Sequence, residues 1–221
     1  MTADLSFEVP GAGSVAALLV RPAQATVGYV LAHGAGAGMR HAFLEAVAGR
    51  CAARGVATFR YQFPYMEAKR QRPDTPEVAA AAVRAAIAEA SVRLAGLPLI
   101  AGGKSFGARM TSTAAAAAPL PGVRGLAFLG FPLHPPGRPG ISRAEHLDRV
   151  TVPMLFLQGT RDEFSDHSLL RPVVDRLGPR ATLHLVEGGD HSFGVLKRSG
   201  RTKDEVLDEL MDVLSRWAAA L

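Results

Sequence analysis

The 221-residue sequence has a single cysteine, Cys51, and aromatic residues make up only 6% of the chain. One cysteine cannot form an intramolecular disulfide, and it has no second thiolate with which to bind a metal. We expect Cys51 to be a small core residue on a helix, because unpaired cysteines are usually buried. The 48% of hydrophobic residues is enough to form the core of one domain, residues 1–221. We also expect no metal or other cofactor.

Long hydrophobic runs are also missing from this sequence. No apolar stretch approaches the roughly 18 to 20 residues that a membrane-spanning helix needs. Residues 1–9 lack both the basic start and the apolar segment of a secretory signal. We therefore expect no membrane partner and a cytoplasmic location.

Lysine is scarce, so arginine supplies most of the positive charge behind the net charge of +5. Binding to nucleic acid requires basic residues gathered on one face, and single strands also need aromatic side chains for stacking. The densest basic stretches are residues 69–72 and 197–201, and neither contains an aromatic residue. We expect a solvated basic surface and no nucleic-acid partner.

Short apolar runs alternate with helical patterns along most of the chain. The expected strands are residues 5–9, 15–20, 27–32, 56–61, 97–101, 126–131, 153–157 and 181–186. The expected helices are residues 41–54, 75–94, 106–118, 168–177 and 203–220. After an opening hairpin, this alternation predicts an α/β fold in which a mostly parallel sheet carries helices on both faces.

The segment Gly-Gly-Lys-Ser-Phe-Gly, residues 102–107, is compatible with two kinds of chemistry. A phosphate-binding loop would need a glycine at the position of Pro98, which instead belongs to an apolar strand. The pattern Gly103-x-Ser105-x-Gly107 lies between an expected strand and an expected helix. In that setting the pattern is typical of a sharp turn that exposes a nucleophilic serine, so we expect Ser105 to be the nucleophile.

A serine needs a base, and the base needs an acid that orients it. His191 lies in a glycine-rich loop directly after the last expected strand, and Asp162 follows the strand before it. The carboxyl ends of parallel strands meet at one edge of the sheet, where such sites form. Glu163 is the main rival of Asp162, and Asp166 is a weaker one that could cap a helix.

The remaining histidines and one aspartate receive structural interpretations. We expect His33 to brace its loop, His41 to cap or precede a helix, and His146 and His167 to lie on the surface. His184 is expected on a strand, where it either packs or lies at an edge. Asp190 is too near His191 in the sequence to orient its ring, and we expect it to brace the loop.

Acyl transfer passes through an oxyanion that two backbone N–H groups stabilise. The residue after the nucleophile, Phe106, would give one, and the glycine-rich loop of residues 33–39 would give the other. We expect Ala35 to be that second donor, with Gly36 as the alternative. A dinucleotide-binding motif in this loop would require glycine at the position of Met39.

Six segments together resemble the α/β-hydrolase superfamily, and specifically its small members without a cap, in the neighbourhood of dienelactone-hydrolase-like proteins. The resemblance is closest to a branch that contains testis-expressed and acetyltransferase-complex hydrolase-like proteins. The matching segments are residues 33–36, 63–67, 102–105, 132–137, 159–162 and 188–192. The resemblance implies an open, shallow site without a helical lid. Dienelactone hydrolases have a cysteine where this chain has Ser105, so the resemblance does not extend to their lactone substrate.

These features predict a serine hydrolase that acts on a small ester or thioester through an acyl-enzyme. The alternative is an interaction or scaffold protein that retains the hydrolase fold without its activity. The oligomeric state is not predicted.

Four further residues are candidates for substrate contact: Gly34, Lys104, Tyr65 and His134. The segments that contain Tyr65 and His134 follow strands, so they either form walls of the site or simply stiffen two loops. Lys104, together with Arg60 and Arg109, either binds an anionic acyl group or forms internal ion pairs, and we favour the ion pairs.

Overall fold

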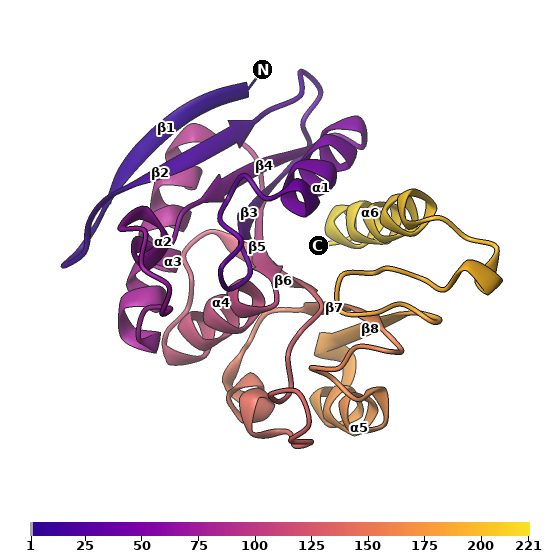
Figure 1. Ribbon diagram of the computed structural model, residues 1–221. Coiled ribbons are helices and arrows are strands. Elements are labelled where there is room, and N and C mark those ends of the chain that lie inside the picture. Colours follow the sequence, from indigo (N-terminus) through magenta and orange to yellow (C-terminus); the bar gives the residue numbers. More distant parts are fainter. Residues whose placement is uncertain (1) are drawn as a thin grey trace.

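The computed structural model describes residues 2–221 and contains one eight-stranded sheet (Figure 1). The strands are β1 Thr2–Val9, β2 Gly13–Val20, β3 Val27–Ala32, β4 Val56–Tyr61, β5 Leu99–Lys104, β6 Val123–Leu129, β7 Met154–Gly159 and β8 Ala181–Val186. They are arranged in the order β1-β2-β4-β3-β5-β6-β7-β8. The pairs β1–β2 and β2–β4 are antiparallel and every other pair is parallel.

Helices cover both faces of the sheet, as the sequence predicts. They are α1 Ala42–Ala53, α2 Pro64–Glu67, α3 Pro76–Arg93, α4 Phe106–Ala117, α5 His167–Leu177 and α6 Lys203–Ala219, with 3₁₀ turns η1 Ser142–Arg149, η2 Gly178–Arg180 and η3 Lys197–Ser199. Helices α1 and α6 pack into one apolar core, and α3, α4 and α5 pack into the core on the opposite face (Figure 1). This is the α/β-hydrolase fold, and no cap domain is present within residues 2–221.

The central strands are mostly apolar because both of their faces are covered. Every residue of β3, β4, β5 and β7 is buried. The predicted bounds of β3, β4 and β8 coincide with the observed ones, whereas β5 begins two residues later than predicted and runs on to Lys104. The short α2 and the three 3₁₀ turns are not predicted, because segments this short carry little periodicity.

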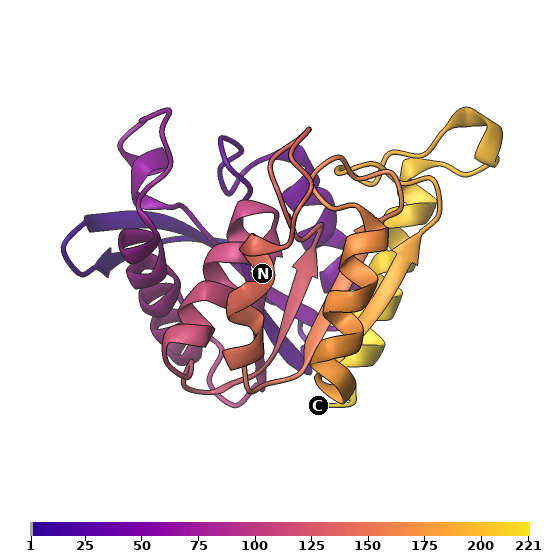
Figure 2. The same ribbon diagram turned by 90° about the horizontal axis from the view of Figure 1, so that it is seen from below.

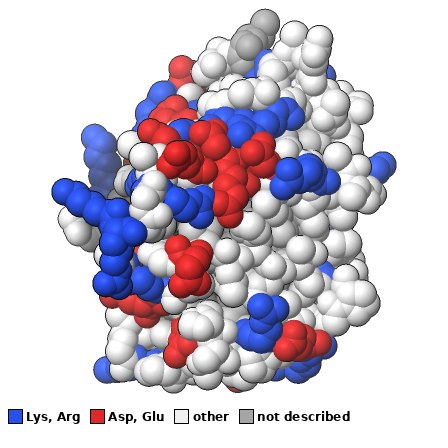
Figure 3. All heavy atoms as spheres, turned by 90° about the vertical axis from the view of Figure 1, so that its right-hand side faces the viewer, with Lys and Arg blue, Asp and Glu red and all other residues white. Residues whose placement is uncertain are grey.

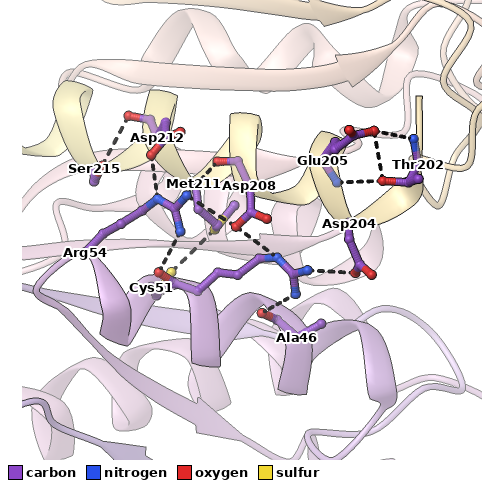
Figure 4. A network of polar contacts seen from close by, with 11 residues as sticks. Ala46, Cys51, Arg54, Thr202, Asp204, Glu205, Asp208, Met211, Asp212 and Ser215 are labelled. Atoms are coloured by element: carbon purple, nitrogen blue, oxygen red, sulfur yellow. Dashed lines mark hydrogen bonds and ion pairs between the residues drawn. The ribbon is translucent and has the colours of Figure 1, made fainter. Parts of the chain in front are cut away.

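Helices α1 and α6 are held together by an apolar contact and by ion pairs (Figure 4). Cys51 is fully buried on α1, as predicted, and its Sγ lies 3.4 Å from Met211 Sδ on α6. Arg54 Nε donates to Asp212 at 2.6 Å, and Arg54 also pairs with Asp208 at 3.3 Å. Both carboxylates are about half exposed, so each pair contributes at most about 1 kcal/mol.

Basic and acidic side chains are interspersed on the face shown in Figure 3, where blue and red groups adjoin one another. No helix within the described part of the chain is long and apolar enough to cross a membrane. Residues 2–221 also contain no cluster of three or more His, Cys, Asp or Glu side chains arranged to hold a metal ion.

Candidate active site

Three side chains from distant parts of the sequence form one hydrogen-bonded chain. His191 Nε2 lies 2.9 Å from Ser105 Oγ, and His191 Nδ1 lies 2.7 Å from Asp162 Oδ2. Ser105 directly follows β5, Asp162 follows β7, and His191 follows β8. The loops after these parallel strands stand at one edge of the sheet, at the top in Figure 2. The structure thus brings together the predicted nucleophile, acid and base.

Ser105 occupies a strained turn between β5 and α4. Its φ of 51° and ψ of −108° are uncommon for a residue with a side chain. The two glycines of the predicted motif lie directly against β3. A Cβ on Gly103 would lie 2.3 Å from Ala32 O, and one on Gly107 would lie 2.7 Å from the same atom. Only glycine allows this approach, which positions the serine at the edge of the sheet.

Replacing Gly103 by alanine is therefore expected to lower the free energy of unfolding by at least about 3 kcal/mol, through overpacking and through the positive φ of 150°. Urea unfolding followed by circular dichroism measures this change. Gly49→Ala is the control, because Gly49 lies within α1 and a Cβ there meets nothing within 4 Å. That control should gain about 0.5 to 1 kcal/mol. Equal effects at the two glycines would contradict the steric account.

Asp162 is the buried carboxylate at one end of this hydrogen-bonded series of side chains, with 5% of its surface exposed. Its Oδ1 accepts from the Phe164 N–H at 2.8 Å, and its Oδ2 accepts from Gln158 Nε2 at 2.5 Å in addition to His191. A carboxylate only accepts, so His191 carries its proton on Nδ1 and directs the lone pair of Nε2 at Ser105. The rival Glu163 is exposed, and Asp166 caps α5 by accepting from the Ser168 N–H.

Within the part of the chain that the structure describes, the predicted oxyanion donors, Ala35 and Phe106, have free N–H groups, whereas the N–H group of the alternative, Gly36, is already hydrogen-bonded. The Gly36 N–H donates to Tyr65 Oη at 2.9 Å, so this group is already engaged. Within residues 2–221, the N–H groups of Ala35 and Phe106 have no protein acceptor. Phe106 is also the first residue of α4, where the helix dipole favours negative charge. The contacts therefore favour Ala35 over Gly36.

His33 braces the glycine-rich loop, and His41 caps the helix that follows this loop. His33 Nε2 accepts from the Phe63 N–H at 3.1 Å, and Nδ1 donates to Gly34 O at 2.7 Å. Burial lowers the pKa of His33 to about 4, so this ring is neutral and can keep both bonds. His41 caps α1 by accepting from the Phe43 N–H at 3.2 Å. Both placements agree with the sequence-based expectation.

A cavity of about 280 Å³ opens beside Ser105 and His191. Of the predicted substrate contacts, Gly34 and Lys104 line it, as does Ala35. The structure adds apolar lining that the sequence analysis missed, from Phe43, Leu44 and Phe164. The Phe164 ring lies 4.4 Å from the His191 ring, centroid to centroid. The sequence did carry a hint of this lining, because Phe43 and Leu44 come shortly after the glycine-rich loop and Phe164 comes shortly after Asp162.

Tyr65 and His134 do not line this cavity. The Tyr65 hydroxyl holds the glycine-rich loop through Gly36, and the Tyr65 N–H donates to Asp74 at 2.9 Å. His134 Nδ1 bonds to Pro135 O, and its Nε2 accepts from the Asp166 N–H at 3.3 Å. Of the two roles considered for these segments, these contacts favour loop stiffening, and substrate contact by either residue stays a prediction.

One histidine placement was wrong. His146 is partly buried rather than on the surface, because η1 packs against α4. Its Nε2 lies 2.8 Å from Ser112 Oγ, and Ser112 in turn donates to Arg109 O at 2.9 Å. Burial, together with nearby arginines, lowers the pKa of His146 to about 4. His167 is exposed, as expected, and His184 bonds to Glu209 from the edge strand β8.

Asp190 braces the loop that carries His191, as predicted. Its Oδ1 accepts from the N–H groups of Ser192 and Gly194, each at 2.8 Å. The side chain is therefore engaged with its own loop, and Asp162 rather than Asp190 orients the His191 ring.

The ion pairs expected of the basic residues are only partly present. Arg60 pairs with Glu45 at 2.8 Å, but Lys104 and Arg109 form no ion pair within the described residues. Lys104 Nζ has no hydrogen-bond partner either. It lies 6.0 Å from the ring centre of Phe43 and 5.8 Å from that of Phe193. Burial lowers the pKa of Lys104 to about 7, an effect that Asp162 partly offsets.

Lys104→Met is accordingly expected to stabilise the fold at neutral pH. Between its folded pKa of about 7 and its ordinary value of 10.5, the lysine binds more protons unfolded than folded. Wild-type stability therefore falls as the pH drops from 10.5 to 7, by about 1.4 kcal/mol per unit. The variant should gain about 3 to 5 kcal/mol at pH 7, and the gain should largely vanish near pH 10.5. Urea unfolding at several pH values measures it, and a gain independent of pH would contradict the account.

Sequence and structural comparisons agree with this architecture. Residues 25–219 match the model of the alpha/beta hydrolase domain family, so the chain belongs to that family. The chain is similar to an α/β serine hydrolase without a lid from Xanthomonas campestris, with 22% identity and a TM-score of 0.77 over 98% of this chain and 94% of that one. It is also similar to a dienelactone hydrolase from Anabaena variabilis, with 19% identity and a TM-score of 0.75 over 98% and 96% of the two chains.

A third similar structure is a cold-adapted esterase from an Arctic intertidal metagenomic library. The two chains are 20% identical, with a TM-score of 0.68 over 97% of this chain and 93% of the esterase. At these identities the structural likenesses establish the fold, and the chemistry has to be argued from the residues of this chain.

Proposed function

We propose that this protein is a serine hydrolase that cleaves small esters or thioesters through an acyl-enzyme on Ser105. The observation that carries the proposal is the unbroken relay from Asp162 through His191 to Ser105, with distances of 2.7 and 2.9 Å, beside a cavity. Membership of the alpha/beta hydrolase family supports a hydrolase in general. An esterase and a dienelactone hydrolase among the similar structures are consistent with acyl substrates.

In the first half of the reaction, Ser105 Oγ attacks the carbonyl carbon while His191 Nε2 takes the hydroxyl proton. The carbonyl oxygen becomes an oxyanion, which the N–H groups of Ala35 and Phe106 stabilise. The intermediate then collapses. The bond to the alcohol or thiol breaks, the leaving group takes the proton from His191, and the acyl group stays on Ser105.

In the second half, His191 removes a proton from water, and the resulting hydroxide attacks the acyl carbon. Collapse of this second intermediate releases the carboxylic acid and returns the proton to Ser105 Oγ. Asp162 stays ionised throughout, because it stabilises the imidazolium and does not accept its proton.

The size of the cavity beside Ser105 is an argument for a small substrate. An apolar cavity of about 150 Å³ can hold a benzene molecule, and the cavity beside Ser105 measures about 280 Å³. Phe43, Leu44 and Phe164 make much of its wall apolar. An acyl or leaving group of roughly this size would fill it, whereas a long lipid chain would extend into solvent.

Labelling with a fluorophosphonate, followed by intact-mass measurement and peptide mapping, tests the proposal. One phosphonyl group should attach to Ser105, and Ser105→Ala should stay unlabelled. Ser112→Ala is the control, because Ser112 also contacts a histidine but lies outside the relay. It should label like the wild type. A folded wild-type protein that remains unlabelled would favour a scaffold protein with the same fold.

A further inference from the structure

Gln158 is a fully buried glutamine directly behind the acid of the relay. It is the penultimate residue of β7, and its side chain joins two loops. Gln158 Oε1 accepts from the Phe131 N–H at 2.8 Å, and Nε2 donates to Asp162 Oδ2 at 2.5 Å. The Phe131 N–H requires an oxygen acceptor, which fixes the amide orientation and directs its NH₂ group at the carboxylate.

The carboxylate of Asp162 is thereby held at both oxygens. The Phe164 N–H binds Oδ1, and Gln158 and His191 share Oδ2. With one fixed donor at each oxygen besides the imidazole, the carboxylate cannot rotate away from His191 without losing a hydrogen bond.

The loop that carries Asp162 is tied to the segment after β6 at further points. The His134 N–H donates to Phe164 O at 3.1 Å, and His134 Nε2 accepts from the Asp166 N–H at 3.3 Å. Together with the bond between Gln158 and Phe131, these contacts make residues 131–134 a frame for the acid loop. Gln158 is the member of this frame that touches the carboxylate itself.

We propose that Gln158 is a positioning residue that acts through Asp162 by holding Oδ2 against His191. This inference rests on the serine-hydrolase function proposed above. The competing role is purely structural, in which the amide only satisfies the buried Phe131 N–H.

Two substitutions separate these roles. Gln158→Met keeps the approximate shape but removes the donor to Asp162, and kcat for a nitrophenyl ester should fall about 100-fold at unchanged KM, as expected for a misplaced catalytic group. Gln158→Glu can replace both bonds only while the new carboxyl is protonated, since its hydroxyl then donates to Asp162. Ionised, it repels Asp162, because two adjacent carboxylates resist carrying charge together.

The ratio of kcat for Gln158→Glu to wild-type kcat should therefore depend on pH. It should stay within about threefold of unity near pH 6 and fall about 100-fold by pH 9. The titratable groups facing Asp162 are His191 and Lys104. Both are present in each protein, so the titration that the two proteins share divides out of the ratio. A structural role predicts a loss that does not vary with pH.

Nuclear magnetic resonance gives a readout that does not need turnover. The proton shared by His191 Nδ1 and Asp162 should resonate far downfield in the wild type, and Gln158→Met should shift or abolish this signal. Val83→Ala is the stability control, because Val83 is buried on α3, a helix that packs on α4 and on strands β1, β3 and β4. It should lower the unfolding temperature while leaving the signal and kcat unchanged.

The inference is overturned if Gln158→Met keeps both the wild-type signal and the wild-type kcat, or if Gln158→Glu loses activity equally at every pH. Its failure is distinguishable from failure of the proposed function. If only the role of Gln158 is wrong, the wild type still labels at Ser105. If the proposed function is wrong, the wild type neither labels nor hydrolyses the ester, and the downfield signal alone then tests the role of Gln158.

Discussion

Ser105→Ala is expected to lower kcat for ester hydrolysis by on the order of 10⁶-fold, with KM nearly unchanged. The substitution removes the atom that forms the acyl bond, but it leaves the cavity and the backbone donors in place. The residual rate should still exceed that in water by about 10³-fold, because the oxyanion donors remain. Steady-state hydrolysis of a short-chain nitrophenyl ester measures the loss.

The residues of the relay should also act as a unit. A double variant, Ser105→Ala with His191→Ala, should be no slower than Ser105→Ala alone, because the imidazole has no task once the hydroxyl is gone. Activity within tenfold of wild type in Ser105→Ala would show that another residue performs the chemistry. Additive losses in the double variant would show that His191 does not act through Ser105.

Asp162→Asn is expected to lower kcat by about 10⁴-fold. The amide has lost the negative charge that stabilises the imidazolium. The aspartate accepts three hydrogen bonds on two oxygens, from Gln158, Phe164 and His191, whereas the asparagine has only one acceptor oxygen. One of its N–H groups must then face a donor, which disturbs the orientation of the ring. The loss should appear in kcat across the pH range, and stopped assays with the same ester measure it.

Glu163→Gln provides the matched control for this substitution. Glu163 is adjacent in sequence and carries the same charge, but it is exposed and lies outside the relay. Its kcat should remain within about twofold of wild type, since an exposed charge is screened by solvent. The reverse result, with a large loss of kcat in Glu163→Gln and a small one in Asp162→Asn, would show that Glu163 and not Asp162 is the acid.

Much of the fold was predictable because burial on both faces leaves a clear mark on a strand. The run at residues 27–32 is apolar, the run at residues 56–61 is mostly so, and their bounds match β3 and β4. The site was predictable for a related reason. Parallel strands end at one edge, so polar residues in the loops that follow β5, β7 and β8 were expected to lie near one another.

The contacts that the sequence did not reveal depend on segments meeting from far apart. Lys104 looked like a partner for an acid, yet its amino group is buried near the rings of Phe43 and Phe193 and has no hydrogen-bond partner among the described residues. His146 looked exposed because its own segment is polar, and only the packing of η1 on α4 buries it. Tertiary packing determines these environments, so they cannot be predicted from the local sequence.

Trapping the acyl-enzyme tests the central claim most directly. Wild-type protein mixed with excess nitrophenyl acetate, quenched in acid within milliseconds and analysed by mass spectrometry, should carry one acetyl group that peptide mapping assigns to Ser105. The amount of acetylated protein should match a burst of nitrophenol released in the same interval. Steady turnover without any acetylated protein, or an acetyl group on a different residue, would contradict the account.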